Sequence, residues 1–200
     1  MISDMNQPLG THVGNSLEVT EAVETLRGRG SAELRELCLV LGSVLLVKAG
    51  LTESREEAAE KLSESLDSGR ALDKFMEFVS AQGGDTSVFG DDGLLPVAPL
   101  CLEVPAPQDG YVKSISCAEV GMASLLTGAG REKKDDVLDL RAGLIVHRKV
   151  GDAVRKGESI ATVYASQEEK LEPAARKLAE AYGFSEEPAS PLRLVHEVLM

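Results

Sequence analysis

Cysteine is scarce in this 200-residue chain, which contains three. Cys38, Cys101 and Cys117 are widely spaced and form no Cys-x-x-Cys pair, so the sequence offers neither a zinc-binding nor a dithiol redox motif. A free cysteine behaves as a small apolar side chain. We therefore expect all three to be reduced residues that pack in the interior.

Long apolar runs are also missing. No stretch approaches the roughly 18 consecutive apolar residues that a membrane-spanning helix needs. The first residues lack the cationic region and the apolar core of a secretory signal peptide. These two observations predict a cytoplasmic protein.

Basic residues are outnumbered, with 21 Lys and Arg against 33 Asp and Glu, for a net charge of −12. The one basic cluster, residues 131–134, is followed at once by Asp135 and Asp136. Nucleic acids and anionic membranes require basic surfaces. We therefore expect neither as a partner and attribute the acidity to solubility.

The periodicity of the sequence changes near Gly93, which predicts one part over residues 1–93 and another over 94–200. In the first part, apolar residues recur at helical spacing. Ser31 predicts a helix start, and Ser54 with Glu57 predicts a capping box, in which a hydroxyl and a carboxylate each accept from a free amide. Helices are expected over residues 18–27, 31–49, 54–68 and around 72–79.

The second part shows short strands separated by turns such as Asp109-Gly110 and Lys156-Gly157-Glu158, which indicates a small barrel or sandwich. A helix is expected over residues 167–182, followed by a tail from Pro188. The predicted class is α+β: a helical part, then a small β-rich domain closed by a helix. Strands are expected over residues 97–104, 111–115, 143–146 and 159–164.

The order of turns in this β-rich part resembles the barrel-sandwich hybrid, or hammerhead, of biotinyl and lipoyl domains. Carrier domains of that kind present a lysine on a hairpin to hold the cofactor. No Met-Lys-Met or Asp-Lys-Ala sequence occurs here, so we expect a β module without a prosthetic group.

Recognisable catalytic motifs are absent. The glycine-rich residues 128–131 lack the Gly-Lys-Ser/Thr ending of a phosphate loop, and no Gly-x-Ser-x-Gly sequence occurs. The three histidines, His12, His147 and His196, are too scattered for a metal triad. The sequence therefore predicts no catalytic and no cofactor-binding residue in this chain.

The first ten residues do not resemble the start of a fold. Ile2 and Met5 are apolar, and Gln7 to Gly10 has the composition of a turn that leaves a strand. A strand needs a neighbour for its backbone groups, and no candidate lies close by in sequence. This pattern predicts that the chain begins within a larger fold.

Several motifs, in order, resemble the pyrimidine-nucleoside and thymidine phosphorylases. The first is Asp4-Met5-Asn6-Gln7-Pro8-Leu9-Gly10, followed by Val13-Gly14-Asn15 and Leu17-Glu18-Val19-x-Glu21-Ala22. Further matches are Ala81-Gln82-Gly83-Gly84-Asp85, Asp109-Gly110-Tyr111-Val112, Gly128-Ala129-Gly130-Arg131 and His147-x-Lys149-Val150-Gly151-Asp152. The resemblance covers essentially the whole chain and is to the C-terminal half of the family.

The resemblance implies an enzyme that cleaves a pyrimidine nucleoside with phosphate, giving the free base and a pentose 1-phosphate. Family members are homodimers with a helical domain, an α/β domain and a cleft between them. The family's Lys-x-Ser-Thr-Gly-Gly phosphate-binding region, its base-binding segment and its helical dimerisation domain have no counterpart here. We therefore expect residues 1–93 to be a helical remnant of the α/β domain and this chain alone to be inactive.

One further expectation follows from this resemblance, and one alternative to it remains. Helices deprived of the sheet they would cover expose apolar faces, which predicts self-association or strand exchange around residues 1–5. The alternative to a phosphorylase portion is a non-catalytic hammerhead-type module with a binding or regulatory role.

The resemblance also implies a structural monovalent cation, potassium. The matching ligands are the main-chain carbonyls of Leu9 and His12 and the side chain of Glu21. Hard cations prefer such oxygens. Because the family's other ligands have no counterpart here, we expect the cation to be absent or weakly bound. Without a cation, Glu21 is expected to be a solvated carboxylate near a helix start.

Overall fold

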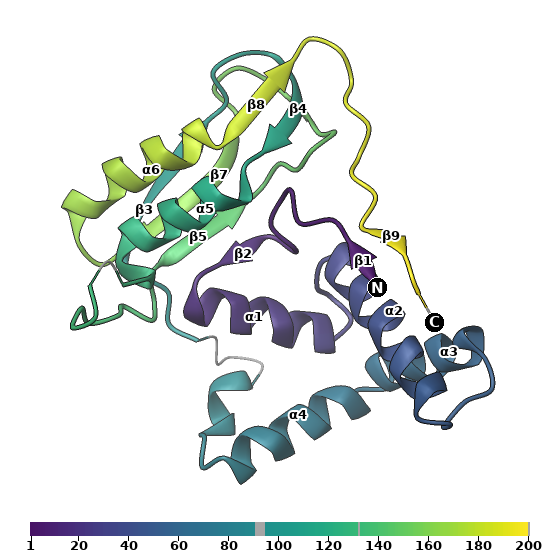
Figure 1. The fold of residues 1–200 in the computed structure, drawn as a ribbon. Helices are drawn as coiled ribbons and strands as arrows, with labels where there is room; N and C mark the ends of the chain where they lie inside the picture. The colour runs from purple at the N-terminus through teal and green to yellow at the C-terminus, as the bar shows by residue number, and fades with distance from the viewer. Residues whose placement is uncertain (91–94, 132, 200) are drawn as a thin grey trace. The chain divides into compact units, whose positions relative to one another are not determined.

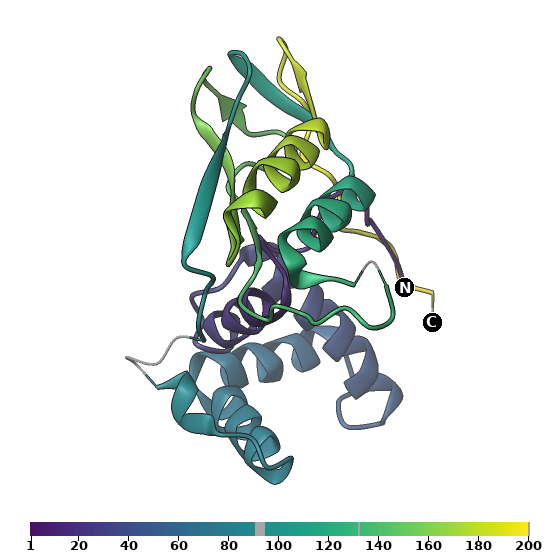
Figure 2. The same ribbon diagram turned by 90° about the vertical axis from the view of Figure 1, so that its left-hand side faces the viewer.

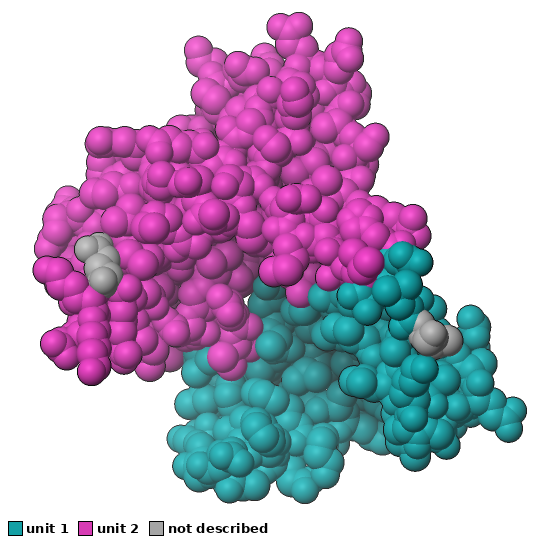
Figure 3. Space-filling model, in the orientation of Figure 1, with its two compact units in different colours: residues 1, 20–95, 197–200 teal, residues 2–19, 96–196 magenta. Residues whose placement is uncertain are grey.

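The computed structural model describes residues 1–90, 95–131 and 133–199, which form two compact units (Figure 3). The first unit comprises Thr20–Leu95 with Met1 and Glu197–Met200, and the second comprises Ile2–Val19 and Pro96–His196. The boundary predicted at residues 93–94 lies outside the described residues. Helices and small antiparallel sheets occur together, which confirms the α+β class.

The first unit is helical, as the spacing of apolar residues predicts. Its first helix, α1, begins in residues of the second unit and starts three positions before the predicted Glu18. None of the described helices is long and apolar enough to cross a membrane. The helices are α1 (Asn15–Leu26), α2 (Ala32–Lys48), α3 (Arg55–Asp67) and α4 (Arg70–Ala81), with a 3-10 turn at Thr86–Phe89.

Serine hydroxyls cap α2 and α3. Ser31 Oγ accepts from Leu34 N at 3.1 Å, and Ser54 Oγ accepts from Glu57 N at 3.1 Å. The Glu57 carboxylate, however, accepts from Glu53 N at 3.0 Å rather than from Ser54 N. The predicted capping box is therefore wrong by one residue in its second bond.

Two antiparallel sheets form the framework of the second unit (Figure 1). In the larger sheet, β7 lies between β5 and β3, and β2 extends the β5 edge. The strands of this sheet are β2 (His12–Val13), β5 (Gly143–Val146), β7 (Ser159–Ala165) and β3 (Leu100–Pro105). The smaller sheet contains β6 (Ala153–Val154), β4 (Gly110–Ile115) and β8 (Tyr182–Ser185).

The opening strand has a partner after all. β1 (Ile2–Ser3) pairs with β9 (Val195–Glu197), and Asp4 N donates to Leu194 O at 2.9 Å. No partner lies close by in sequence, as predicted, but one lies near the other end of the chain. Its partner lies in the residues predicted as a tail. Because the two strands are separated by almost the whole chain, patterns of neighbouring residues cannot predict that they pair.

Two helices cover the core of the second unit instead of the one predicted. α5 (Cys117–Ser124) and α6 (Leu171–Glu180) lie side by side in both ribbon views (Figures 1 and 2). The sequence signal for α5 is a capping pattern, in which Ser116 Oγ accepts from Glu119 N at 3.4 Å. The helix predicted to reach residue 182 ends at Glu180, and its last predicted residue begins β8.

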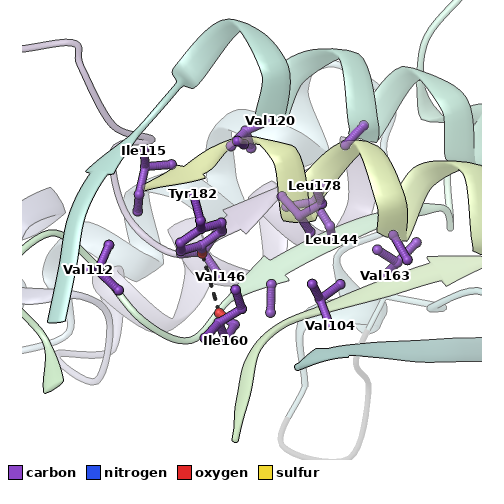
Figure 4. Close-up of a cluster of buried hydrophobic side chains, with 14 of the residues drawn as sticks. Val104, Val112, Ile115, Val120, Leu144, Val146, Ile160, Val163, Leu178 and Tyr182 are labelled. Carbon is purple, nitrogen blue, oxygen red and sulfur yellow. Dashed lines mark hydrogen bonds between the residues drawn. The ribbon is translucent and has the colours of Figure 1, made fainter. Parts of the chain in front are cut away.

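The core lies between these helices and the larger sheet (Figure 4). Val112, Leu144, Val163 and Leu178 are fully buried. The Tyr182 hydroxyl donates towards main-chain carbonyls, Arg148 O at 3.2 Å and Ile160 O at 3.4 Å, so its polar end is satisfied. Burial raises the pKa of the Tyr182 phenol, which therefore stays protonated across the physiological range.

The cysteines are free, but the expectation that they pack in the interior is wrong. Cys38 and Cys101 are exposed and Cys117 is half-buried. Cys101 lies on β3, whose alternation places Leu102 and Val104 towards the core and Cys101 away from it. Apolar character alone does not determine which face of a strand or helix a residue occupies.

Replacing Leu178 by alanine should lower the free energy of unfolding of the second unit by about 2–5 kcal/mol, because it leaves a cavity in a fully buried site. Leu140→Ala, at a side chain that is 57% exposed, is the matched control and should change stability by less than about 0.5 kcal/mol. Urea unfolding followed by circular dichroism measures both. Equal effects of the two substitutions would contradict this position of the core.

Candidate functional site

Two of the three predicted cation ligands lie in one segment of the second unit, residues 7–13. β2 pairs with β5 in a register that places His12 opposite Ile145 and Val13 opposite Leu144. Val146 N also donates to Thr11 O at 2.7 Å. The segment therefore lies along the edge of the larger sheet, more than 130 residues away in sequence from the strand that holds it.

Two glycines allow this close approach. Gly14 has a φ of 128°, and a Cβ added to it would lie 2.7 Å from Ala142 O. Gly143 has a φ of 156°, and a Cβ there would lie 2.4 Å from Val13 O. At both glycines, a side chain would be disfavoured by the positive φ and would also clash with the neighbouring backbone. Gly14 belongs to the Val13-Gly14-Asn15 motif, which gives that motif a physical reason.

Lys149 holds the same segment from the turn that follows β5. Its Nζ donates to Pro8 O at 2.6 Å and to Gly10 O at 2.8 Å. The next residue, Val150, donates its main-chain N–H to Gln7 Oε1 at 3.1 Å. Asp152 Oδ2 accepts from Lys149 N at 2.7 Å and shapes this turn. We call residues 7–12 the carbonyl loop.

Glu21, the third predicted ligand, belongs to the first unit, whereas Leu9 and His12 belong to the second. It lies in the middle of α1 and is only 6% exposed, so the expectation of a solvated carboxylate near a helix start is wrong. Its main-chain carbonyl accepts from Thr25 Oγ1 at 2.8 Å.

The histidines have structural partners. His12 Nδ1 lies 2.9 Å from Thr11 Oγ1, and His147 Nε2 lies 2.7 Å from Thr162 Oγ1. Partial burial, with help from the charge of Arg148, lowers the pKa of His147 and favours its neutral form. Within the described ranges, no three His, Cys, Asp or Glu side chains come together as a metal site.

The glycine-rich residues 128–131 continue a π-helical turn, Leu125–Ala129, that follows α5. Gly128 has a φ of 100°, and its carbonyl accepts from Asp139 N at 3.0 Å. A Cβ on Gly128 would lie 2.8 Å from Lys170 Nζ. The glycine thus allows a backbone conformation in this turn that a side chain would not tolerate.

Sequence reasoning missed the contacts of Lys149 and Gln7, although a signal was present. Each residue lies in a separate motif shared with the phosphorylases, His147-x-Lys149-Val150-Gly151-Asp152 and Asp4-Met5-Asn6-Gln7-Pro8-Leu9-Gly10. Two motifs that match in order but lie 140 residues apart become adjacent in the fold. The hydrogen bonds between the two motifs explain why both occur in the chain, and neither motif alone reveals these bonds.

Comparison with protein families divides the chain in two. Residues 1–72 match the family model for the glycosyl transferase family, a/b domain. Residues 111–185 match the model for the pyrimidine nucleoside phosphorylase C-terminal domain. The first match includes the carbonyl loop and α1 to α3, and the second includes Lys149 and both helices of the β-rich unit.

Curated relatives match the chain from end to end. The pyrimidine-nucleoside phosphorylase of Geobacillus stearothermophilus is 44% identical over 98% of this chain, and that of Bacillus subtilis is 43% identical over 100%. The matched regions make up 45% and 46% of those two proteins, so the chain spans just under half the length of its curated relatives. Continuous identity at this level, together with the two family models, means that the chain belongs to the pyrimidine-nucleoside phosphorylase family.

Proposed function

We propose that this chain supplies the C-terminal part of a pyrimidine-nucleoside phosphorylase. Such an enzyme transfers the pentose of a pyrimidine nucleoside to phosphate and releases the free base. The observation that carries this proposal is the 44% identity to a pyrimidine-nucleoside phosphorylase over 98% of the chain. A homodimeric assembly of the complete enzyme belongs to the same proposal.

We also propose that the chain alone is inactive. Phosphorolysis requires phosphate and nucleoside to be held in a near-attack geometry. No phosphate-loop or Lys-x-Ser-Thr-Gly-Gly sequence occurs in the 200 residues, and the carbonyl loop offers carbonyl oxygens, which bind cations rather than phosphate. The residues that would hold both substrates are therefore expected in the portion of the relatives that this chain does not span.

A cytoplasmic site of action is part of this proposal. Disulfides persist in oxidising compartments and are rare in reducing ones. Cys38, Cys101 and Cys117 are all free, which suits a reducing compartment.

For the monovalent cation we propose a partial site. The carbonyls of Leu9 and His12 and the carboxylate of Glu21 would contribute to holding potassium, and this chain alone would hold it weakly. When bound, such a cation supplies structural stabilisation of the loop rather than a reacting group. The support is the donor chemistry of the two main-chain carbonyls, together with the way in which the carbonyl loop is held.

Lys149 has a positioning role in this proposal. The carbonyls of Pro8 and Gly10 both accept from Lys149 Nζ. The ammonium group therefore holds the backbone on both sides of Leu9, the residue whose carbonyl is proposed as a ligand.

The pure chain should show no phosphorolysis of uridine or thymidine, because the substrate-binding portion is not part of it. Release of free base, followed by ultraviolet absorbance with inorganic phosphate in excess, measures this. The full-length enzyme of Bacillus subtilis assayed in parallel is the positive control. Turnover that rises in proportion to the concentration of the pure chain would contradict the inactivity.

Replacing chloride salts of choline by those of potassium at equal ionic strength should raise the melting temperature by no more than about 1 °C. Weak binding, with a dissociation constant near or above the salt concentration of about 0.1 M, stabilises by only a few tenths of a kcal/mol. Differential scanning fluorimetry measures the shift, with Glu21→Gln as the comparison. A rise of several degrees that Glu21→Gln abolishes would show that the chain holds the cation tightly by itself.

Lys149→Met should loosen the carbonyl loop, because it removes two charge-assisted hydrogen bonds and leaves the Pro8 and Gly10 carbonyls without that donor. Amide hydrogen exchange should rise at least about tenfold in peptides covering residues 5–13 and 147–152. Lys156→Met, at an exposed turn lysine, is the matched control and should leave both peptides unchanged. Unaltered exchange in Lys149→Met would show that the loop does not depend on the ammonium group.

A further inference from the structure

A cavity of 380 Å³ lies in the second unit, where the π-helical turn that ends α5 meets the 3-10 turn Glu168–Lys170 that begins α6. The two helices lie side by side in both ribbon views, and their adjoining turns are in contact (Figures 1 and 2). Sites for small molecules typically have volumes of about 300–1,000 Å³. We call this space the polar cavity. Its polar lining consists of Thr127, Asp139, Arg141, Ser166, Gln167 and Lys170.

The polar cavity belongs to one domain of the chain. Its polar lining lies between positions 127 and 170, inside the second unit and inside residues 111–185, which match the C-terminal domain model. Among the described residues, none of the first unit lines it. The cavity is therefore formed by this domain itself.

Lys170 brings a positive charge to the wall of the polar cavity. It is half-buried, and its Nζ would lie only 2.8 Å from a Cβ at position 128, so the ammonium group packs where Gly128 has no side chain. Among the described residues, no carboxylate forms an ion pair with Lys170. An anion beside a partly buried charge stabilises it more than in water, because the effective dielectric constant there is lower.

Arg141 supplies a second positive charge. Its Nε donates to Asp139 Oδ1 at 3.3 Å, and its Nη2 donates to Ser166 Oγ at 3.0 Å. These bonds hold the guanidinium group at the wall and use two of its five N–H donors. Asp139 is the one carboxylate among the described lining residues, so two cations face one anion in a chain whose net charge is −12. The polar cavity is thus locally basic.

The donors around the polar cavity favour a phosphate group as the ligand. Lys170 and Arg141 present charged N–H donors, and the side-chain amide of Gln167 adds uncharged ones. A phosphate monoester offers three terminal oxygens as strong acceptors, whereas a carboxylate offers two. Charge-assisted hydrogen bonds from arginine and lysine to phosphate are among the strong ones. A metal cation would be repelled by the same two side chains.

We propose that the polar cavity binds the phosphate group of a small phosphate monoester of the size of a pentose phosphate, with Lys170 and Arg141 as its charged contacts. The volume leaves room for an organic group beside the phosphate, and Leu138 gives that group an apolar wall. The motif Gly128-Ala129-Gly130-Arg131 gains a role, because its first glycine leaves the space that the Lys170 ammonium group occupies. This binding does not depend on phosphorolysis by the complete enzyme.

Isothermal titration calorimetry of the whole chain with ribose 5-phosphate tests this binding. Ribose 5-phosphate should bind saturably at one site per chain, and ribose should not bind. Lys170→Met should weaken the binding at least about tenfold, because it removes a charged hydrogen-bond donor. Lys156→Met, which makes the same change of net charge at an exposed turn, is the matched control and should alter the affinity by less than about twofold.

Amide hydrogen exchange locates the ligand and needs no substitution. Saturating ribose 5-phosphate should slow exchange at least about threefold in peptides covering residues 127–141 and 166–171, because the bound ligand links the two turns. Peptides covering residues 150–158 should not change. This measurement on the wild-type chain decides the matter even if Lys170→Met proves too unstable to titrate.

Inorganic phosphate and acetate, titrated at equal ionic strength, separate the classes of ligand. Weaker binding of both than of ribose 5-phosphate supports the monoester. Equal affinity for inorganic phosphate would show that the cavity takes free phosphate and would overturn the monoester assignment, and equal affinity for acetate would overturn the phosphate assignment. If ribose 5-phosphate shows no saturable binding, or binds the wild type and Lys170→Met equally well, the site itself is wrong.

Discussion

Pairing of β7 along both of its edges is the constraint on which the second unit depends. β7 pairs with β5 along one edge and with β3 along the other, and Ile160, Ala161 and Val163 are completely or almost completely buried. Because side chains alternate along a strand, a shift of one residue would exchange the side chains on one face for those on the other. The register of β7 therefore fixes β5, β5 fixes β2, and β2 places the carbonyl loop at the sheet edge.

The carbonyl loop shows how a short motif acquires meaning from distant residues. Gly143 allows β2 to approach β5, and Lys149 and Val150 then bind the loop through the Pro8 and Gly10 carbonyls and the Gln7 side chain. All three distant residues lie on β5 or in the turn after it. The loop and this turn are two parts of one structure, which explains why both carry family motifs.

The two units differ in how completely they satisfy their own apolar surface. The second unit encloses a core that includes Val112, Leu144 and Leu178 between its sheets and two helices. In the first unit, α2 is an apolar helix with one buried residue. A helix of this composition is expected in the interior of a domain. The first unit therefore buries less of its own apolar surface than the second unit does.

The sequence by itself determined the family, the α+β class, the caps of α2 and α3 and most strands, because these depend on motifs and on periodicities of a few residues. The tertiary structure alone decided the pairing of β1 with β9, the burial of Glu21, the exposure of Cys38 and Cys101 and the contacts of Lys149. Each of these depends on residues far apart in the chain or on which face of an element meets the core. Local sequence patterns therefore predict the secondary structure of a segment, but only tertiary packing determines which residues that segment contacts.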